Sequence, residues 1–335
     1  MKKAKKTWIY HLIGTFAGLG IIAALVFSVG WQHFLEALRD VSFTHVLLAL
    51  FIYGLSWLPR TLRLKFLAVY SGTRISSLDL FRVNISGYAL NTILPAKMGD
   101  IASIGFLKMK GMSFGRAAAV IIQTRILDLA AISFLTAPVL LITLGRSSPS
   151  WILVSLIVCT TIVFAAASLA LLDKNKMISS FLKKLSQYPE NRFLFSALTK
   201  ISRAYNDYHE LASNRRLLVP TLLLSLFIWM LEGATCVVFL SVMEHRLTVL
   251  PPVLAVLVAN IGKSVPSTPG GVGIYETVAA TVLLLQGIPI EAATAVGILD
   301  HATKKLFNLA IGLPSAAAIG GSIFTARETP HSLDL

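Results

Sequence analysis

The sequence is poor in cysteine and in charge, and poorest in acidic side chains. Its two cysteines, Cys159 and Cys236, lie in apolar runs without the spacing of a metal site or a disulfide framework. Only 14% of the 335 residues are charged, too few to cover the surface of a soluble domain of this length. Asp and Glu number 16 against 30 Lys and Arg. The low charged fraction excludes an ordinary soluble domain. The shortage of acidic residues gives the chain a net charge of +14.

Several motifs of enzymes and pumps are missing. There is no G-x-x-x-x-G-K-[ST] loop, so any transport must run downhill or use a gradient rather than a bound nucleotide. G-x-S-x-G, H-E-x-x-H and clustered metal ligands are also absent, so we expect no cofactor. An enzyme is therefore less expected than a transporter, although the sequence leaves this open.

What the sequence has is long apolar runs. Apolar residues make up 55% of the chain, its mean hydropathy is +0.74, and several runs reach about 20 residues, enough to cross a hydrocarbon core. Residues 9–29 follow a lysine-rich start without a cleavage site, which indicates an uncleaved first helix. The sequence predicts an all-α polytopic membrane protein forming one domain over 1–335, with full spans at 9–29, 45–69, 117–142, 151–172, 217–240 and 292–320.

Two further apolar regions, 80–110 and 251–287, are interrupted by proline and glycine, which favours re-entrant hairpins. The order span, span, hairpin, span then occurs in 9–142 and again in 151–320. Because the first half begins inside and the second outside, the two halves form an inverted-topology repeat, an arrangement typical of transporters. Ile126-Leu-Asp-Leu-Ala130 and Ile298-Leu-Asp-His-Ala302 echo this repeat weakly.

Loop charge predicts the orientation. With both hairpins returning to their own side, most of the 30 basic residues fall on the cytoplasmic side. We expect a multi-pass protein of the bacterial cytoplasmic (inner) membrane with cytoplasmic N- and C-termini. The basic segment 173–216 has the pattern of an amphipathic helix on the cytoplasmic leaflet, or of a solvated connector. Anionic lipid headgroups explain the positive charge better than nucleic acid does.

Ten charged residues fall at membrane depth, where each isolated charge costs about 2.5–3.5 kcal/mol. They must face the interior and pair, or line a wet cavity. Arg125 and Asp128 are spaced i,i+3, and Asp300 and Lys304 i,i+4, so each pair can share a helix face. Such pairs either only hold helices together or surround a polar headgroup. The ten are Lys97, Asp100, Arg125, Asp128, Glu232, Lys263, Glu276, Asp300, Lys304 and Lys305.

Arg60 and Arg63 lie near the cytoplasmic end of the second span, beyond Pro59, which we expect to kink that helix. Long basic side chains at a helix end usually snorkel to headgroups, so this is the first interpretation. Capture of a substrate phosphate is the alternative.

The hairpin breaks carry the candidate site. Gly99 precedes a helix predicted to start near Asp100, and Gly270-Gly271-Val-Gly273 precedes one near Ile274. Each start presents free backbone N–H groups, an anion site strengthened by the neighbouring lysines. Asp100 and Glu276 either occupy favourable first-turn positions or bind a proton or an amine. His301 is either a satisfied core residue or a protonation switch. The candidate substrate-binding residues are Asn91, Pro95, Lys97, Gly99, Asp100, Arg125, Asp128, Glu232, Asn260, Lys263, Pro269, Gly270, Gly271, Gly273, Glu276, Asp300, His301 and Lys304.

At these residues the chain resembles the transmembrane domain of lysylphosphatidylglycerol synthases, a family of flippase-like integral membrane proteins (UPF0104-like). The resemblance covers about 9–320 and rests on Leu94-Pro-Ala-Lys-Met-Gly-Asp100, Arg125-Ile-Leu-Asp128 and Val265-Pro-Ser-Thr-Pro-Gly-Gly-Val-Gly-Ile-Tyr-Glu276. It implies a helical domain that handles modified phospholipids or lipid-linked intermediates. Ser103 and His301 stand where the family often has arginine, so headgroup preference is open. The soluble aminoacyl-transferase domain of bifunctional members is lacking, so we expect no lipid aminoacylation by this chain alone.

The sequence thus favours a lipid flippase or scramblase-like transporter of an anionic or modified phospholipid or a lipid-linked intermediate. Two alternatives stay open. A membrane-embedded transferase or hydrolase would use Asp100 with Glu276, or Asp128 with Asp300, as acid and base. An accessory subunit would serve a separate synthase. The expected partners are the membrane lipid and, in the accessory-subunit alternative, such a synthase, with no nucleic acid, and the oligomeric state is open.

Overall fold

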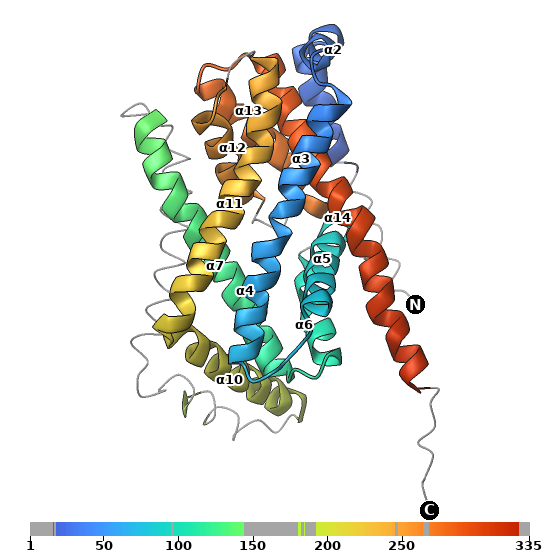
Figure 1. The fold of residues 1–335 in the computed structure, drawn as a ribbon, viewed down its shortest axis with the longest axis vertical. Helices are drawn as coiled ribbons and strands as arrows, with labels where there is room; N and C mark the ends of the chain where they lie inside the picture. Colours follow the sequence, from blue (N-terminus) through green and yellow to red (C-terminus); the bar gives the residue numbers. More distant parts are fainter. Residues whose placement is uncertain are drawn as a thin grey trace, which may run out of the picture.

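The computed structural model describes residues 16, 18–94, 97–143, 180–181, 184, 192–244, 247–263 and 268–327, and every regular element in them is helical (Figure 1). Three helical stretches are long and apolar enough to cross a membrane, at Phe43–Tyr70, Phe114–Val139 and Arg215–Met243. A bent pair, Gly18–Val29 with α2 (Trp31–Leu38), adds a fourth if it is one span. The predicted span 151–172 lies outside the described residues, as does the start of the span 9–29.

The second predicted span is interrupted once. It forms α3 (Phe43–Leu55) and α4 (Trp57–Tyr70), which meet at Ser56. Pro59 follows three residues later and has no N–H to donate to the carbonyl of Leu55, so the helix loses a hydrogen bond in that turn. The interruption therefore lies in the turn preceding the proline, where the sequence predicted a kink.

Both interrupted regions are helix–break–helix units whose two arms pack against each other. The first is α5 (Ser77–Ile93) with α6 (Met98–Met109), and the second is α12 (Leu250–Gly262) with α13 (Ile274–Leu285). A short 3-10 turn, η2 (Pro269–Gly271), lies in the second break. The predicted start near Ile274 is confirmed, and that near Asp100 is two residues late because α6 begins at Met98.

Gly99 has a packing role in the first unit. A Cβ atom at this position would lie 2.1 Å from the carbonyl oxygen of Gly87 in α5. Only glycine lets the backbones of α5 and α6 approach so closely. Ser103, one turn on, donates a hydrogen bond of 3.1 Å to the Gly99 carbonyl oxygen and lies over Gly87. The space in front of Gly99 is therefore filled by α5.

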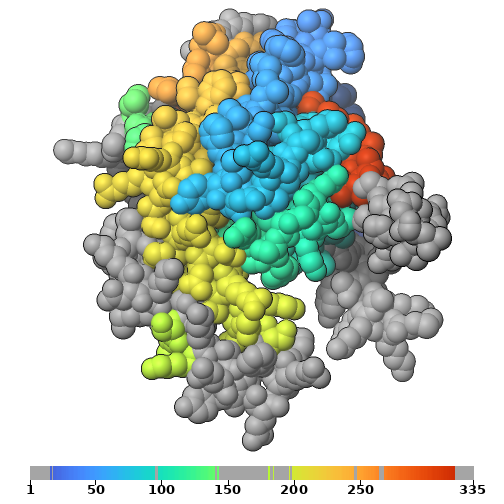
Figure 2. Space-filling view, turned by 60° about the horizontal axis from the view of Figure 1, so that its bottom comes forward, coloured from blue at the N-terminus to red at the C-terminus, as the bar shows by residue number. Residues whose placement is uncertain are grey.

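Longer helices surround the two units. They are α7 (Phe114–Thr143), α10 (Arg192–Ser213), α11 (Arg215–Met243) and α14 (Ile290–Arg327). α11 packs against α3, α4, α7, α12 and α14, and α14 packs along α5. In Figure 2, α4, α5 and α6 lie next to one another on one face with α11 beside them.

The apolar core falls into two main clusters. One joins α11, α12, α13 and α14 around Leu254, Tyr275 and Leu283. The other joins α4, α5, α6, α7 and α10 around Leu67, Leu80 and Leu107. Each broken unit is thus embedded in its own apolar cluster, and the buried charges lie between the two.

α10 occupies part of the predicted connector 173–216 and crosses the lower ends of α4 and α7 in Figure 1. It packs against α7 and α11, with Tyr208, Leu211 and Ala212 buried. Its other face, with Ile201 exposed, is open. A helical connector is confirmed for Arg192–Ser213, and its contact with a lipid leaflet stays a prediction.

Candidate functional site

A cavity of about 390 Å³ lies where the two helix breaks meet α7, α11 and α14. The first unit contributes Lys97 and Asp100, and the second contributes Lys263, Gly270 and Gly271. Twelve predicted residues line this cavity. They are Asn91, Lys97, Asp100, Arg125, Asp128, Glu232, Asn260, Lys263, Gly270, Gly271, His301 and Lys304.

Five other predicted residues do not line the cavity. Gly99 packs against α5, and Pro269 and Gly273 form the turns that lead into α13. Glu276 and Asp300 lie behind the wall, where they hold lining residues in place. Pro95 is outside the described residues.

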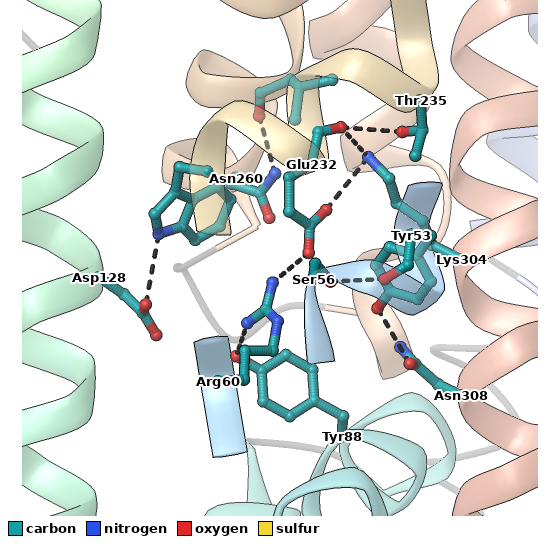
Figure 3. A network of polar contacts seen from close by, with 12 residues as sticks. Tyr53, Ser56, Arg60, Tyr88, Asp128, Glu232, Thr235, Asn260, Lys304 and Asn308 are labelled. Carbon is teal, nitrogen blue, oxygen red and sulfur yellow. Dashed lines mark hydrogen bonds and ion pairs between the residues drawn. The ribbon is translucent and has the colours of Figure 1, made fainter. Parts of the chain in front are cut away.

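One buried network of charges joins α4, α11 and α14 (Figure 3). Arg60 donates from Nη2 to Glu232 Oε1, and Glu232 Oε2 lies 3.1 Å from Lys304 Nζ. Lys304 Nζ is also 2.8 Å from Asp300 Oδ2, so the predicted i,i+4 pair is confirmed. Thr235 and Tyr275 donate hydrogen bonds to Asp300. Every charge in this network has a partner.

A second network joins α4, α6 and α7. Arg63 Nη1 lies 2.7 Å from Asp128 Oδ1, and Arg125 Nη1 lies 3.4 Å from Asp128 Oδ2, which confirms the predicted i,i+3 pair. Arg125 also donates two hydrogen bonds to Asp100, which accepts a third from Asn91 Nδ2 at 2.8 Å. This network ties the start of α6 to the middle of α7.

Tyr88 of α5 connects the two networks. Its hydroxyl accepts hydrogen bonds from Arg60 Nη1 at 2.7 Å and from Arg125 Nη1 at 3.1 Å. Both guanidinium carbons lie 5.0 Å from the centre of the Tyr88 ring, within cation–π range. A phenol at this position gives each arginine one more neutral partner without adding negative charge.

The first interpretation of Arg60 and Arg63, snorkelling to headgroups, is wrong. Their residues are 1% and 2% exposed, and their guanidinium groups face inward to Glu232 and Asp128. α4 is packed against α5, α7 and α11, so its arginine-bearing face has no route to the lipid interface. Neither arginine lines the cavity, so the alternative of capturing a substrate phosphate gains no support here.

Three lysines at the cavity lack a carboxylate partner within the described part of the chain. Lys97 makes no ion pair there, and the Lys263 ammonium lies 5.2 Å from the centre of the Tyr275 ring. Lys305 Nζ has only the hydroxyl of Thr92, at 3.4 Å. The neighbouring arginines and Lys304 are all paired with carboxylates. These three lysines are therefore the cations that can bind an anionic ligand in the cavity.

His301 is held from behind by Glu276. Its Nδ1 lies 2.7 Å from Glu276 Oε1, while Glu276 Oε2 accepts the backbone N–H of Gly273 at 2.7 Å. The ring stacks on Tyr275 with the centroids 4.3 Å apart. Glu276 therefore does occupy a capping position in the first turn of α13, and it also orients His301. The other ring nitrogen, Nε2, is buried and has no hydrogen-bond partner among the residues that the structure describes.

Apolar side chains form another part of the cavity lining, the apolar wall. It consists of Leu94 after α5, Leu129 and Ile132 on α7, and Trp229 on α11. The Trp229 indole N–H donates to Asp128 at 3.3 Å, so the apolar wall is in direct contact with the charged network. The cavity is thus amphipathic, as a site for a lipid headgroup and the start of its chains would be.

Sequence reasoning missed several lining residues. Tyr53 and Tyr88 carry no charge, so only the fold shows that they line the cavity, whereas Trp229 and Asn308 lie one helical turn from Glu232 and Lys304 and could have been found from that spacing. Tyr53 donates to Asn308 Oδ1 at 2.9 Å across 255 positions of the chain (Figure 3). Lys305 was counted at membrane depth and left out of the candidate site, although its charge and position were a usable signal. The remaining unpredicted lining residues are Leu94, Leu129, Ile132 and Thr268.

The chain matches one known protein family over most of its length. The family model described as the lysylphosphatidylglycerol synthase transmembrane region matches residues 15–312. The chain belongs to this family. It is an integral multi-pass membrane protein, which agrees with the apolar helices of the fold.

Archaeal proteins are among those similar to this chain. A UPF0104 membrane protein of Pyrococcus horikoshii is 28% identical over 85% of this chain and 90% of its own length. Another, of Methanothermobacter thermautotrophicus, is 21% identical over 91% of this chain and 94% of its own. Glycosyltransferase AglD of Haloferax volcanii is 35% identical over 38% of this chain, which corresponds to 21% of that protein.

Proposed function

We propose that this protein is a lipid flippase or scramblase-like transporter that moves an anionic or modified phospholipid, or a lipid-linked intermediate, across the membrane. One observation carries the proposal. Inside a membrane protein, one cavity is lined by three lysines that have no carboxylate partner in the described residues and by the apolar side chains of Leu94, Leu129, Ile132 and Trp229. An anionic headgroup matches the lysines, and the beginning of acyl or prenyl chains matches the apolar side chains.

The proposed topology has about six full spans and two re-entrant hairpins, α5–α6 and α12–α13, in an inverted repeat of 9–142 and 151–320. Both termini then face the cytoplasm. Alternating exposure of the two halves would move the headgroup while the hydrocarbon chains stay in lipid. Without a nucleotide-binding loop, movement is downhill or coupled to a gradient.

Cysteine labelling tests this topology. A cysteine at Gly111, beyond α6, is expected to react from the cytoplasmic side, and one at Gly287, beyond α13, from the opposite side. Neither glycine has a neighbouring atom within 4 Å of an added Cβ, although both have positive φ and the substitutions carry some backbone strain. Labelling of both from one side would refute the inverted repeat.

Reconstitution tests transport. Liposomes containing the purified protein are loaded with fluorescent anionic or zwitterionic lipids, and transbilayer movement is followed by bleaching of the outer leaflet with and without a pH gradient. We expect movement of anionic lipids, strongly reduced in Lys97→Ala/Lys263→Ala. The control is Lys65→Ala/Lys110→Ala, because these lysines lie outside the cavity and bond to Ser77 and Asp79. Equal movement with wild type, variant and empty liposomes would refute the proposal.

A second candidate function is supported by the similarity to Glycosyltransferase AglD over 136 residues. In this alternative the cavity would serve an enzyme acting on a lipid-linked sugar or phosphate. It would need an acid and a base, yet Asp100 and Asp128 are each bonded to arginine and Asp300 to lysine. Turnover of a lipid-linked donor by the pure protein, abolished in Asp100→Asn, would favour the enzyme. If the purified protein is inactive by itself and activity appears when a co-purifying synthase is added, the accessory-subunit interpretation would be favoured.

A further inference from the structure

Resting on the proposed function, we propose that the cavity takes a lipid that ends in a phosphate monoester, with His301 sharing a proton with the phosphate group. A monoester differs from the phosphodiester of a common phospholipid in having an exchangeable hydroxyl. Two features of the cavity support this assignment: one favours an anionic phosphate, and the other matches the hydroxyl.

The first feature is the excess of positive charge. In the cavity and its two networks, cations outnumber carboxylates by two when His301 is neutral. The cations are Arg60, Arg63, Lys97, Arg125, Lys263, Lys304 and Lys305, and the carboxylates are Asp100, Asp128, Glu232, Glu276 and Asp300. An uncompensated charge inside a membrane protein is costly. Any anionic phosphate reduces this excess, and a monoester that still holds the proton it shares with His301 carries about one negative charge, as a phosphodiester does. The excess therefore favours a phosphate group without distinguishing the two kinds of ester.

Two of the lysines lie against the glycine turn of the second break. A Cβ at Gly271, which has positive φ, would lie 2.8 Å from the Cβ of Lys263, and a Cβ at Gly270 would lie 3.3 Å from Lys305 Nζ. Lys97 lines the same cavity from the other hairpin. Ammonium groups donate charge-assisted hydrogen bonds to phosphate oxygens, so lysines that line one cavity can bind a phosphate there.

The second feature is the free nitrogen of His301. A carboxylate only accepts hydrogen bonds, so Glu276 fixes the hydrogen of the neutral ring on Nδ1 and leaves the lone pair on Nε2. This atom is buried without a partner, in a residue that lines the cavity. The second pKa of a phosphate monoester is about 6, so a proton is available between a phosphate oxygen and Nε2. A phosphodiester has no such hydroxyl and leaves Nε2 unsatisfied.

A lipid-borne phosphate and free inorganic phosphate share this chemistry. The apolar wall of Leu94, Leu129, Ile132 and Trp229 has no counterpart in inorganic phosphate. We therefore assign the lipid-borne form, and both sources enter the test.

The test is a displacement experiment on the purified full chain in neutral detergent. Bound fluorescent phosphatidic acid is displaced by unlabelled phosphatidic acid, by phosphatidylglycerol with the same acyl chains, and by inorganic phosphate. We expect phosphatidic acid to displace the probe at roughly tenfold lower concentration than phosphatidylglycerol. In His301→Gln the ratio of the two concentrations is expected to fall toward one. The control is His33→Gln, because His33 is exposed and outside the cavity, and it is expected to keep the wild-type ratio.

The outcomes separate this inference from the proposed function. Equal displacement by phosphatidic acid and phosphatidylglycerol in the wild type would overturn the monoester and leave a lipid site in place. Displacement by inorganic phosphate as effective as that by phosphatidic acid would overturn the lipid-borne form. Failure of every lipid to bind, together with no movement in liposomes, would overturn both proposals. The wild-type ratio alone tests the preference for a phosphate monoester over a phosphodiester, even if His301→Gln does not fold.

Discussion

Replacing Glu232 with glutamine is predicted to destabilise the protein more than replacing its partner Arg60 with methionine. Glu232 accepts from Arg60 and also lies 3.1 Å from Lys304. Glu232→Gln therefore removes a carboxylate from two buried cations at once. Arg60→Met removes one cation, and Glu232 keeps Lys304.

The magnitudes follow from these partners. Removing one member of a buried ion pair costs about 3–5 kcal/mol because a buried charge stays behind. We expect about 3 kcal/mol for Glu232→Gln, since Arg60 is 1% exposed while Lys304 retains Asp300 at 2.8 Å. For Arg60→Met we expect about 1.5–2 kcal/mol, the loss of hydrogen bonds to charged groups without an isolated charge.

Equilibrium unfolding of the purified protein in mixed micelles of rising SDS fraction measures both losses. In Arg60→Met/Glu232→Gln no stranded guanidinium remains, so the double variant is expected to lose at least about 1 kcal/mol less than the sum of the single variants. Equal losses for the two single variants, or strict additivity in the double variant, would refute the assigned network.

Two further predictions concern local packing and surface charge. Gly99→Ala is expected to lower stability by about 1–3 kcal/mol because its Cβ would meet the Gly87 carbonyl. The control is Gly105→Ala on the same helix, which has open space around it and is expected to be neutral or stabilising in the same unfolding assay. Lys110, which is bonded to Asp79, lowers the pKa of that carboxyl, so this pair contributes stability above the ordinary Asp pKa and loses it as the pH falls through the lowered value. Lys110→Ala is therefore expected to cost less than about 1 kcal/mol at pH 7, and the difference from wild type is expected to vanish as the pH falls below the lowered pKa of Asp79. A difference that grows toward low pH would contradict this.

Local signals in the sequence were sufficient for the helix breaks and the short-range ion pairs. The glycine and proline runs end α12 and allow α13 to begin at Ile274, because these residues disfavour a continued helix. The pairs Arg125–Asp128 and Asp300–Lys304 follow from helical spacing alone. Each of these features is decided within a few residues.

Features that depend on tertiary packing could not be found in this way. Arg60 and Glu232 are 172 positions apart, and their pairing requires α4 to lie against α11. The expectation of snorkelling used only the distance of Arg60 from a helix end, which does not report whether that end is covered. Tyr88 gave no signal either, since its role depends on two arginines from other helices.

The departure at Ser103 has a structural reason. Its side chain lies over Gly87, where an added Cβ would be 2.0 Å from the Ser103 hydroxyl oxygen. This tight contact between α5 and α6 leaves no space for a longer side chain in the place of the Ser103 hydroxyl. Under the proposed function, contacts to an anionic headgroup come instead from Lys97, Lys263 and Lys305, which have no carboxylate partner in the described residues.

Lys304 and Lys305 are adjacent on α14, and comparing variants of the two tests which charge is structural and which is available for the proposed ligand. Lys304 is paired with Glu232 and Asp300, whereas the one partner of Lys305 in the described part of the chain is the Thr92 hydroxyl at 3.4 Å. Lys304→Met is expected to cost about 3 kcal/mol, because two carboxylates lose a cation. Lys305→Met is expected to stabilise the empty protein by about 1 kcal/mol or more, because it removes an uncompensated charge at membrane depth, and to weaken the binding of anionic lipid. Unfolding in SDS micelles and lipid displacement measure the two effects on the same samples. Destabilisation by both variants would show that Lys305 is structural and would remove it from the site.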